Sequence, residues 1–379
     1  MRRTTLGVGA VTAEAAIAQA CASELPAIEL FERVARHVRR VVPYDAGCWK
    51  PTDPHTLLFT GFAIEDPEAG RLSSVRWRFV DNELLEPDFA KFRRLARKRQ
   101  PVTTLDEATH GERERSARYR EIHRALGFGA ELRAVFRTRD SCWGGVALVR
   151  DEGRPDFSKD EVAFVARICD HIALGLRVAL LRETDPQETE SAPGMIVLRD
   201  DLTIESLTSQ ARHWLERFPA DRGTGLELPA AVVAVARRAQ LESHAAATAP
   251  PAAARVRLRS GRWLLVHAAP LGAIDSSDCH IAVVVAPAGP VQITPLRLEL
   301  HDLTNREREV TRLLIRGLTN AEIARALHIT RHTVKDHAKA IYAKLGVTSR
   351  SELTGKLFYE QHVPRLDADR LREWVPNAN

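Results

Sequence analysis

The clearest chemistry in this 379-residue chain lies in a row of cations toward its C-terminal end. Arg331, Lys335 and Lys339 recur every four residues, so a helix would place all three on one side, next to Asp336. Guanidinium and ammonium groups bind phosphate oxygens, and lysine also donates to O6 and N7 of guanine. Residues 301–360 hold eleven Lys or Arg and seven Asp or Glu, a net +4 of the chain's +5. This concentration of charge predicts contact with nucleic acid.

The predicted helix over residues 331–345 has an apolar side that would pack against a small domain. Its apolar residues recur at spacings of four, three and four: Val334, Ala338, Ile341 and Leu345. A basic face on an isolated helix is most often only solvated. Here a second capped helix precedes it across a short turn at residues 327–330, which is the arrangement of a helix-turn-helix. The pattern therefore favours a helix that reads DNA.

Capping residues mark the helix boundaries of this region. Three Ser/Thr-x-x-Glu pairs predict capping boxes, at Thr304–Glu307, Thr319–Glu322 and Ser349–Glu352. Gly317 and Gly346 stand where helices should end, because glycine enters the left-handed conformation without a steric penalty. Thr330 is placed to cap the basic helix. A compact all-α unit is predicted.

Residues 303–353 resemble the helix-turn-helix of the LuxR-type transcription regulators. The matching stretches are LTNREREV, GLTN, EIA, TVKDH, KLGV and SRSEL. The resemblance implies a four-helix domain, placed here at residues 297–362, that binds double-stranded DNA as a homodimer. Thr311 stands where leucine is usual, a change we expect to be tolerated at a helix edge. Asp336 puts an acid on the DNA-facing side, so it affects which bases are recognised.

The resemblance also implies roles for individual side chains. Those implied in base-edge contacts are Lys335, Asp336 and Lys339. Those implied in phosphate contacts are Asn320, Thr330, Thr333 and His337. The predicted DNA-binding face is completed by Arg331 and His332. Dimerisation is implied for the helix near Ser351, through an apolar face made of Leu353, Leu357 and Phe358.

The composition is that of a globular protein without a disulfide framework. The five cysteines are scattered and form no C-x-x-C pair, which favours reduced thiols in a cytoplasm. No run approaches the ~18 apolar residues of a membrane span, so no membrane partner is predicted. We find no nucleophile elbow, phosphate loop, dinucleotide fingerprint or metal-ligand spacing. Consequently no catalytic residue, metal or cofactor is predicted.

Polar and proline-rich stretches predict several domains. The chain is long enough for two to four, because one core rarely serves more than about 250–300 residues. Residues 182–193 and 286–296 are predicted linkers, and residues 244–254 are predicted to be a loop inside a domain. They leave a first domain at 12–181 and a second at 194–286.

Residues 12–181 predict an α+β domain with an antiparallel sheet. Its flanking helices are predicted over residues 28–41 and 158–181. The expected strands are AGCWK, TLLFTGF, ELRAVFRT and CWGGVALVR, with basic helices at 87–99 and 116–126 between them. This order, with the matches ELRAVF, WGGVAL and F-S-x-x-E, resembles a GAF domain.

Residues 194–286 predict a second, smaller α+β domain. A hairpin over residues 194–203 is followed by helices at 209–218 and 229–241. Three strands then follow, ARVRLRS, RWLLVHAAPL and HIAVVVAP. This order resembles a PAS domain. GAF and PAS folds commonly enclose ligands, so the two resemblances imply a sensor region and a small-molecule effector.

Five aromatic residues of the first domain are predicted to line a pocket for a flat ligand: Trp49, Phe59, Trp77, Phe79 and Trp143. All are expected on strands, where the alternative is ordinary core packing. Cys48 and Cys142 each precede a tryptophan and leave open an alternative, a GAF-type thiol redox enzyme or redox sensor. Such chemistry needs a resolving thiol close by, and none is near in sequence. The favoured function is a cytoplasmic bacterial transcription regulator, not an enzyme, whose sensor region controls the helix-turn-helix.

Overall fold

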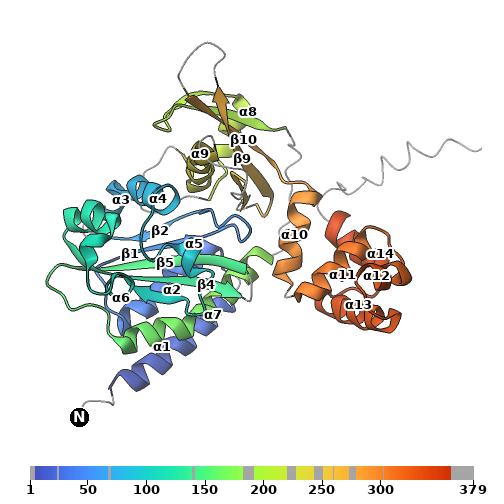
Figure 1. The fold of residues 1–379 in the computed structure, drawn as a ribbon, viewed down its shortest axis with the longest axis horizontal. Helices are drawn as coiled ribbons and strands as arrows, with labels where there is room; N and C mark the ends of the chain where they lie inside the picture. The colour runs from blue at the N-terminus through green and yellow to red at the C-terminus, as the bar shows by residue number, and fades with distance from the viewer. Residues whose placement is uncertain are drawn as a thin grey trace, which may run out of the picture. The chain divides into compact units, whose positions relative to one another are not determined.

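The computed structural model divides into two compact units, Met1–Pro287 and Ala288–Asn379 (Figure 1). It describes residues 5–23, 25–66, 70–138, 141–181, 192–219, 228–242, 251–258, 260–272, 279–301 and 303–359. In these ranges no helix has both the length and the hydropathy needed to cross a lipid bilayer. The first unit contains two antiparallel sheets, and the second is helical.

The first sheet has five antiparallel strands in the order β2-β1-β5-β4-β3. The strands are β1 (Ala46–Pro51), β2 (Ala63–Glu65), β3 (Val102–Thr104), β4 (Phe128–Thr138) and β5 (Ser141–Asp151). The strands expected for AGCWK, ELRAVFRT and CWGGVALVR are therefore confirmed. The strand expected for TLLFTGF is wrong, because residues 56–62 form only an isolated bridge from Phe59 to Thr52.

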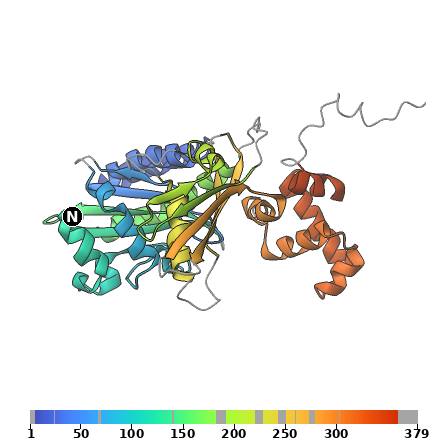
Figure 2. The ribbon, with the colours of Figure 1, turned by 90° about the horizontal axis from the view of Figure 1, so that it is seen from above.

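Three helices pack together on one side of this sheet: α1 (Thr5–Cys21), α2 (Ala27–Val41) and α7 (Lys159–Leu181) (Figure 2). The inward residues of α2 recur at helical spacing and are Leu30, Phe31, Val34, Ala35 and Val38. The start of α7 is fixed by Ser158 and Glu161, which exchange backbone-to-side-chain hydrogen bonds of 3.3 and 2.7 Å. This confirms the predicted flanking helices.

The other side carries short helical pieces: α3 (Arg71–Ser74), α4 (Arg76–Leu84), α5 (Phe92–Leu95), α6 (Leu105–Thr109) and the turns η1 (Arg113–Arg115), η2 (Tyr119–His123) and η3 (Arg124–Leu126). The long basic helix expected at 87–99 is wrong, since only Phe92–Leu95 is helical there. The helix expected at 116–126 is present as a continuous run of helical turns over 117–126, mostly of π and 3-10 type. Carboxylates take backbone N–H groups here, since Glu83 accepts from Phe92 N and Asp88 accepts from Arg118 N, each at 2.8 Å. The sequence pattern did not indicate these long-range bonds.

The two faces of the first sheet differ because successive strand residues point to opposite sides. Toward the long helices, Trp49 and Phe136 stack with ring centroids 6.0 Å apart, and Phe31 of α2 lies 5.7 Å from Trp49. The opposite face carries three buried charged side chains, Lys50, Glu131 and Arg133. A buried charge is costly unless it is paired, so this face must supply partners.

Glu131 and Arg133 are paired with groups of opposite charge, and only Nη2 of Arg133 lacks a hydrogen-bond partner among the described residues. Glu131 accepts hydrogen bonds of 2.8 Å from both Arg118 and Arg133. Arg133 also donates to Glu83 of α4 at 2.8 Å. Burial acts to raise the pKa of Glu131, but the two guanidinium groups outweigh it and hold that pKa well below its usual range. The network ties β4 to α4 and to the segment that contains Arg118.

Lys50 is the exception. Its side chain is completely buried, and its ammonium has no hydrogen-bond partner among the described residues. The ammonium nitrogen lies 4.3 Å from the ring centroids of both Phe79 and Phe92 and 5.4 Å from that of Phe59. Burial lowers the pKa of Lys50 to about 8. Aromatic faces thus take the place that a carboxylate usually has.

The second sheet has the strand order β7-β6-β10-β9-β8, again antiparallel throughout. Its elements are β6 (Gly194–Leu198), β7 (Ile204–Leu207), α8 (Ser209–Leu215), α9 (Ala230–Glu242), β8 (Ala253–Arg257), β9 (Trp263–Gly272) and β10 (Cys279–Pro287). The predicted hairpin, two helices and three strands are all present. If the strands of each sheet are numbered from one along the chain, both sheets have the spatial order 2-1-5-4-3. The PAS resemblance itself stays a prediction.

The two sheet domains are joined by a buried ion pair. Arg255 of β8 donates through Nη2 and Nε to the two carboxylate oxygens of Asp53, at 2.6 and 2.8 Å, and its backbone N–H donates to Asp53 at 2.8 Å. Arg237 of α9 pairs with Asp81 of α4 at 2.7 Å. Leu58, which follows β1, packs in the core of the second domain. These contacts explain why residues 1–287 form one unit.

The second unit begins earlier than the boundary expected at residue 297. Its helices are α10 (Pro290–Leu300), α11 (Asn305–Ile315), α12 (Asn320–Ala326), α13 (Arg331–Leu345) and α14 (Arg350–Thr354), followed by the π-helical turn η4 (Gly355–Tyr359). The prediction of a linker at 286–296 is wrong over most of that range, because α10 already begins at Pro290. Pro290 stands at the start of α10, where its missing N–H is not needed. Thr294 and Arg297 bind carbonyls of η4, and Leu298 joins the core.

We expect Asp53→Ala to destabilise the first unit by about 3–5 kcal/mol, because it leaves the Arg255 guanidinium buried without its carboxylate. Thermal and denaturant unfolding of the full chain measure the effect. Asp170→Ala removes an exposed carboxylate of α7 and is the matched control, with an expected change within about 0.5 kcal/mol. A loss for Asp53→Ala no larger than the control's would mean that the ion pair does not hold the two sheets together.

We expect Lys50→Met to stabilise the chain, because it replaces an unsatisfied buried ammonium by an apolar side chain of similar length. The pKa of Lys50 falls from 10.5 to about 8 on folding. The free-energy cost of burying the charged ammonium is therefore complete below pH 8 and disappears as the pH rises to 10.5. The gain should be roughly 2–3 kcal/mol at pH 7 and nearly absent at pH 10.5. Denaturant unfolding at both pH values tests this, with exposed Lys159→Met as control. A gain that is independent of pH contradicts the explanation.

Candidate nucleic-acid interface

Capping interactions fix the ends of the helices in the second unit. In the first capping box Glu307 accepts from the N–H of Thr304 at 2.7 Å, and Thr304 Oγ1 accepts from the N–H of Glu307 at 3.2 Å. Thr319 and Glu322 repeat the box. The third differs from the prediction, because Glu352 accepts from the N–H of Thr348 rather than of Ser349. The glycines expected at helix ends, Gly317 and Gly346, have φ angles of +92° and +62°.

The turn between α12 and α13 is as short as predicted. His328 has a φ of +53°, and the N–H of Ile329 donates to Ala324 O at 3.0 Å, which closes the end of α12. Thr330 Oγ1 then accepts from the N–H of Thr333 at 3.1 Å and begins α13. The direction of α13 relative to α12 is therefore fixed by hydrogen bonds within a few residues of its start.

Helix α13 separates its residues by burial. The apolar stripe Val334, Ala338, Ile341 and Leu345 is buried in the core of the unit, as predicted. The exposed residues of its first turns are Arg331, His332, Lys335, Asp336 and Lys339, and Ala343 and Lys344 are exposed nearer its end. Of the residues expected at phosphates, Thr330 is exposed, whereas Asn320, Thr333 and His337 are half-buried. Among the described residues of the unit, these five side chains of the first turns of α13 remain exposed.

A shallow groove of about 450 Å³ brings residues of two helices together. Asn320, the first residue of α12, lines it together with Lys335 and Lys339 of α13. Tyr342, Val347 and Thr348 also line the groove and contribute apolar surface and two hydroxyl groups. Three residues that the sequence assigned to DNA contacts therefore share one concave surface.

Asp336 has a partner that the sequence reasoning did not name. Its carboxylate lies 3.0 Å from Nδ1 of His332, one turn earlier on the same exposed side. Lys335 and Lys339 make no ion pair within the part of the chain that the structure describes, so Asp336 does not neutralise either of them. Both ammonium groups are available to a ligand.

Two other cations of this region serve the fold instead. Lys344 binds both oxygens of Glu307, at 2.6 and 2.9 Å, and so links α13 to the capping box of α11. Burial acts to raise the pKa of Glu307, but bonds from Lys344 and Thr304 hold it below its ordinary value. Arg350 donates to Leu318 O at 2.8 Å and to Leu314 O. A count of basic residues in the sequence cannot distinguish these two cations, which bind groups of their own unit, from cations that are left for a ligand.

Thr311 is not at a helix edge, so that expectation is wrong. Its side chain is fully buried, and its hydroxyl donates to Glu307 O at 2.7 Å. The bond to the preceding turn satisfies the hydroxyl, which is why a polar residue fits among apolar neighbours.

The expected apolar dimer face also needs correction. Leu353 and Leu357 are buried at 0% and 3% exposure in the core of their own unit, against residues of α11 and α13. They are therefore not an exposed surface in a single copy. Phe358 lies outside the residues whose side chains are described. The exposed residues of α14 are Ser351 and Glu352, so any contact between copies through this helix would have to use its polar side.

The five aromatic residues expected to share a ligand pocket do not meet in one place. Trp77 and Phe79 lie on α4 rather than on a strand. Trp49 packs in the core beneath α2, and the indole of Trp143 donates to Thr138 Oγ1 at 2.8 Å. Of the five, Phe59 alone lines the cavity of about 250 Å³ in this unit. Periodicity did not predict α4, because its contacts are set by the buried charges of β4.

The cysteines give no support to thiol chemistry. Cys142 is buried, its thiol lies 3.4 Å from Gly144 O, and burial raises its pKa to about 11. Cys48 is also buried. A thiol that stays protonated is a poor nucleophile, so this environment disfavours the redox alternative.

Two protein families match the chain. Residues 301–356 match "Bacterial regulatory proteins, luxR family", and residues 26–176 match the GAF domain. The first match covers α11 to α14 with the capped turn, and the second covers the first sheet with most of its helices. Among solved structures, the GAF domain of an Acinetobacter phosphoenolpyruvate-protein phosphotransferase aligns with a TM-score of 0.29 and 13% identity, over 46% of this chain and 97% of that one.

Three curated relatives illustrate the similarity. The nitrate/nitrite response regulator protein NarL of Escherichia coli is 37% identical over 23% of this chain and 40% of its own length. The transcriptional regulatory protein LnrK of Bacillus subtilis is 52% identical over 14% and 24%, and the probable transcriptional regulatory protein SgaR of Hyphomicrobium methylovorum is 42% identical over 26% and 47%. The chain thus spans less than half the length of each. It carries a GAF domain and, at residues 301–356, a helix-turn-helix domain of the luxR family of bacterial regulatory proteins.

Proposed function

We propose that this chain is a bacterial transcription regulator that binds double-stranded DNA through α13 under the control of its GAF-containing unit. One observation carries the proposal. Lys335 and Lys339 stand exposed on a capped helix and pair with no acid among the residues that the structure describes. They lie beside Asn320 in one groove, while the other side of that helix is core. A helix held in this way presents cations in a fixed geometry, which is what entry into a major groove requires.

The side chains divide into those that position the helix and those that read bases. Thr330 and Thr333, whose hydroxyls lie 2.9 Å apart at the start of α13, are placed to contact phosphate together with Asn320. Lys335 and Lys339 would donate to O6 and N7 of guanine. Asp336 would accept from N4 of cytosine and is held toward the helix start by His332. His337 and Arg331 would add sequence-independent phosphate contacts.

The bound form is proposed to be a homodimer on a site with two-fold symmetry. Two copies would place their α13 helices about one turn of DNA apart. The GAF-containing unit would act as the sensor, with a signal that changes dimerisation or access to α13. A cytoplasmic location follows from this function. The comparisons support the regulator class through relatives named as transcriptional regulatory proteins.

Selection of binding sites from random duplexes by the full chain tests the proposal directly. Enrichment of a two-fold symmetric site is expected. The logarithm of the binding constant should fall linearly with the logarithm of the salt concentration, at a slope of about −0.9 for each phosphate neutralised. Failure to enrich any sequence, together with an affinity that does not depend on salt, would rule out the proposed function.

Lys339→Ala is expected to weaken binding to the selected site by roughly 1–3 kcal/mol and to relax the preference at one base pair. The reason is loss of a donor to a base edge, with no effect on the core, since Lys339 is exposed. Fluorescence anisotropy on cognate and scrambled duplexes measures both effects. Lys159→Ala removes the same charge from α7 and serves as control. A loss that is equal on every sequence would assign Lys339 to phosphate rather than to a base.

Asp336→Ala is expected to leave non-specific affinity equal or tighter and to weaken discrimination, because it removes both a repulsive charge and a cytosine acceptor. A repeat of the site selection with this variant reads out the base preferences. His332→Ala is the matched control: it removes the ion-pair partner of Asp336 and keeps the carboxylate. Unchanged preferences for Asp336→Ala would show that this carboxylate is only a surface charge.

A further inference from the structure

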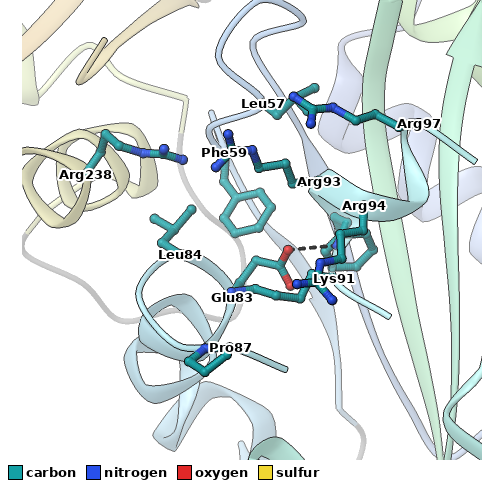
Figure 3. A pocket seen from close by; sticks show the side chains of 11 residues that line it. Leu57, Phe59, Glu83, Leu84, Pro87, Lys91, Arg93, Arg94, Arg97 and Arg238 are labelled. Carbon is teal, nitrogen blue, oxygen red and sulfur yellow. Dashed lines mark hydrogen bonds between the residues drawn. The ribbon is translucent and has the colours of Figure 1, made fainter. Parts of the chain in front are cut away.

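The cavity that contains Phe59 lies between the two sheet domains of the first unit (Figure 3). Residues of α4 and α5 and of the loop between β1 and β2 form most of its wall, and Arg238 of α9 closes it from the second domain. In Figure 3 the side chain of Arg238 extends from α9 toward Phe59 and Arg93. Both domains thus contribute to one concave space.

The wall of the cavity is strongly basic. Five cations line it: Lys91, Arg93, Arg94, Arg97 and Arg238. Arg93, Arg94 and Arg97 are exposed and make no ion pair with any residue of the described ranges. Lys91 donates to a backbone carbonyl, that of Glu86, which leaves its charge uncompensated by that bond.

The single carboxylate in the wall is already engaged. One oxygen of Glu83 accepts from Phe92 N and the other from Arg133, each at 2.8 Å. Its two oxygens therefore belong to the buried network of β4, although its charge also acts on Lys91 and favours the charged form of that ammonium. An anion entering the cavity would meet five positive groups and no free carboxylate in the wall.

The floor of the cavity is apolar. Phe59, Leu84 and Phe92 line it, and Lys50 lies behind two of these rings. Its buried ammonium, which makes no hydrogen bond to any described residue, adds a further positive charge one ring away from the space. The volume of about 250 Å³ lies below the roughly 300–1,000 Å³ of pockets for drug-sized ligands.

We propose that this cavity binds a small organic acid, with its carboxylate or phosphate on the cations of α5 and Arg238 and its apolar body against Phe59 and Leu84. The concave shape and the apolar floor favour such a ligand over the extended, charged backbone of DNA. A ligand bound here contacts both sheet domains, so it stabilises their junction. Its role as the effector rests on the proposed function, whereas the binding itself does not.

Thermal unfolding and calorimetric titration of the full chain, without DNA, test the binding. The compounds are benzoate and phenyl phosphate, their neutral counterpart benzamide, and inorganic phosphate. At least one organic acid should bind and raise Tm. Benzamide, which has the ring but no negative charge, and inorganic phosphate, which has the charge but no apolar body, should each bind at least about tenfold more weakly. No binding by either organic acid, or equal binding by benzamide, overturns the proposal.

A pair of matched variants locates the site. The triple change Arg93→Gln, Arg94→Gln and Arg97→Gln should weaken acid binding about tenfold or more. The change Lys98→Gln with Arg99→Gln removes exposed cations of the same segment that do not line the cavity, and it should leave binding unaltered. Equal losses in both variants overturn the assignment to the cavity.

DNA binding of the same variants is measured separately. The triple variant should keep the DNA affinity of the unaltered chain when no acid is present. If it loses DNA affinity and the unaltered chain binds no acid, the basic segment is a DNA contact and the proposal fails. Because titration uses no DNA, a failure of the proposed function leaves the acid-binding result interpretable.

Discussion

The need to pair two buried charges on β4 shapes the first domain. Glu131 and Arg133 point to the face of the sheet away from the long helices, where neither could stay charged without partners. Arg118 and Glu83 supply them, and Glu83 also takes the N–H of Phe92. The chain from α4 to α5 is thereby held as a loop close to the sheet. The basic residues of α5 stand around a cavity because of this constraint.

The same pairing principle joins the two sheet domains. Asp53 and Arg255 are 202 positions apart, yet both carboxylate oxygens meet the guanidinium in a buried site. A buried pair contributes little net stability compared with apolar packing, but breaking it is costly, so it fixes how the two domains meet. The cavity proposed for an organic acid lies along this junction and takes residues from each side of it. The proposed acid site and the contact between the two domains thus share one surface.

The helix-turn-helix depends on local bonds instead. Each cap links residues three positions apart, and the turn at His328 closes within a few residues. Such bonds fix the direction of α13 without help from the first unit. Two cations, Lys344 and Arg350, hold the helices together, and Lys335 and Lys339 remain for a ligand. The domain therefore separates its structural charges from its exposed ones.

The sequence by itself determined the caps and the two sides of the basic helix, because these follow from periodicity and short-range capping. Its motifs carried the resemblance to a LuxR-type helix-turn-helix and to a GAF domain. Periodicity also indicated the second sheet and the central strands of the first, but not β2 or β3. Only the tertiary structure decided which charges are buried, since pairs such as Arg118 with Glu131 and Asp53 with Arg255 join residues that no spacing relates. It also placed Trp77 and Phe79 on α4, Thr311 in the core, and Leu353 and Leu357 inside their own unit. Burial is a property of the assembled fold. Residue type and period indicate which side of an element is apolar, but not what will cover it.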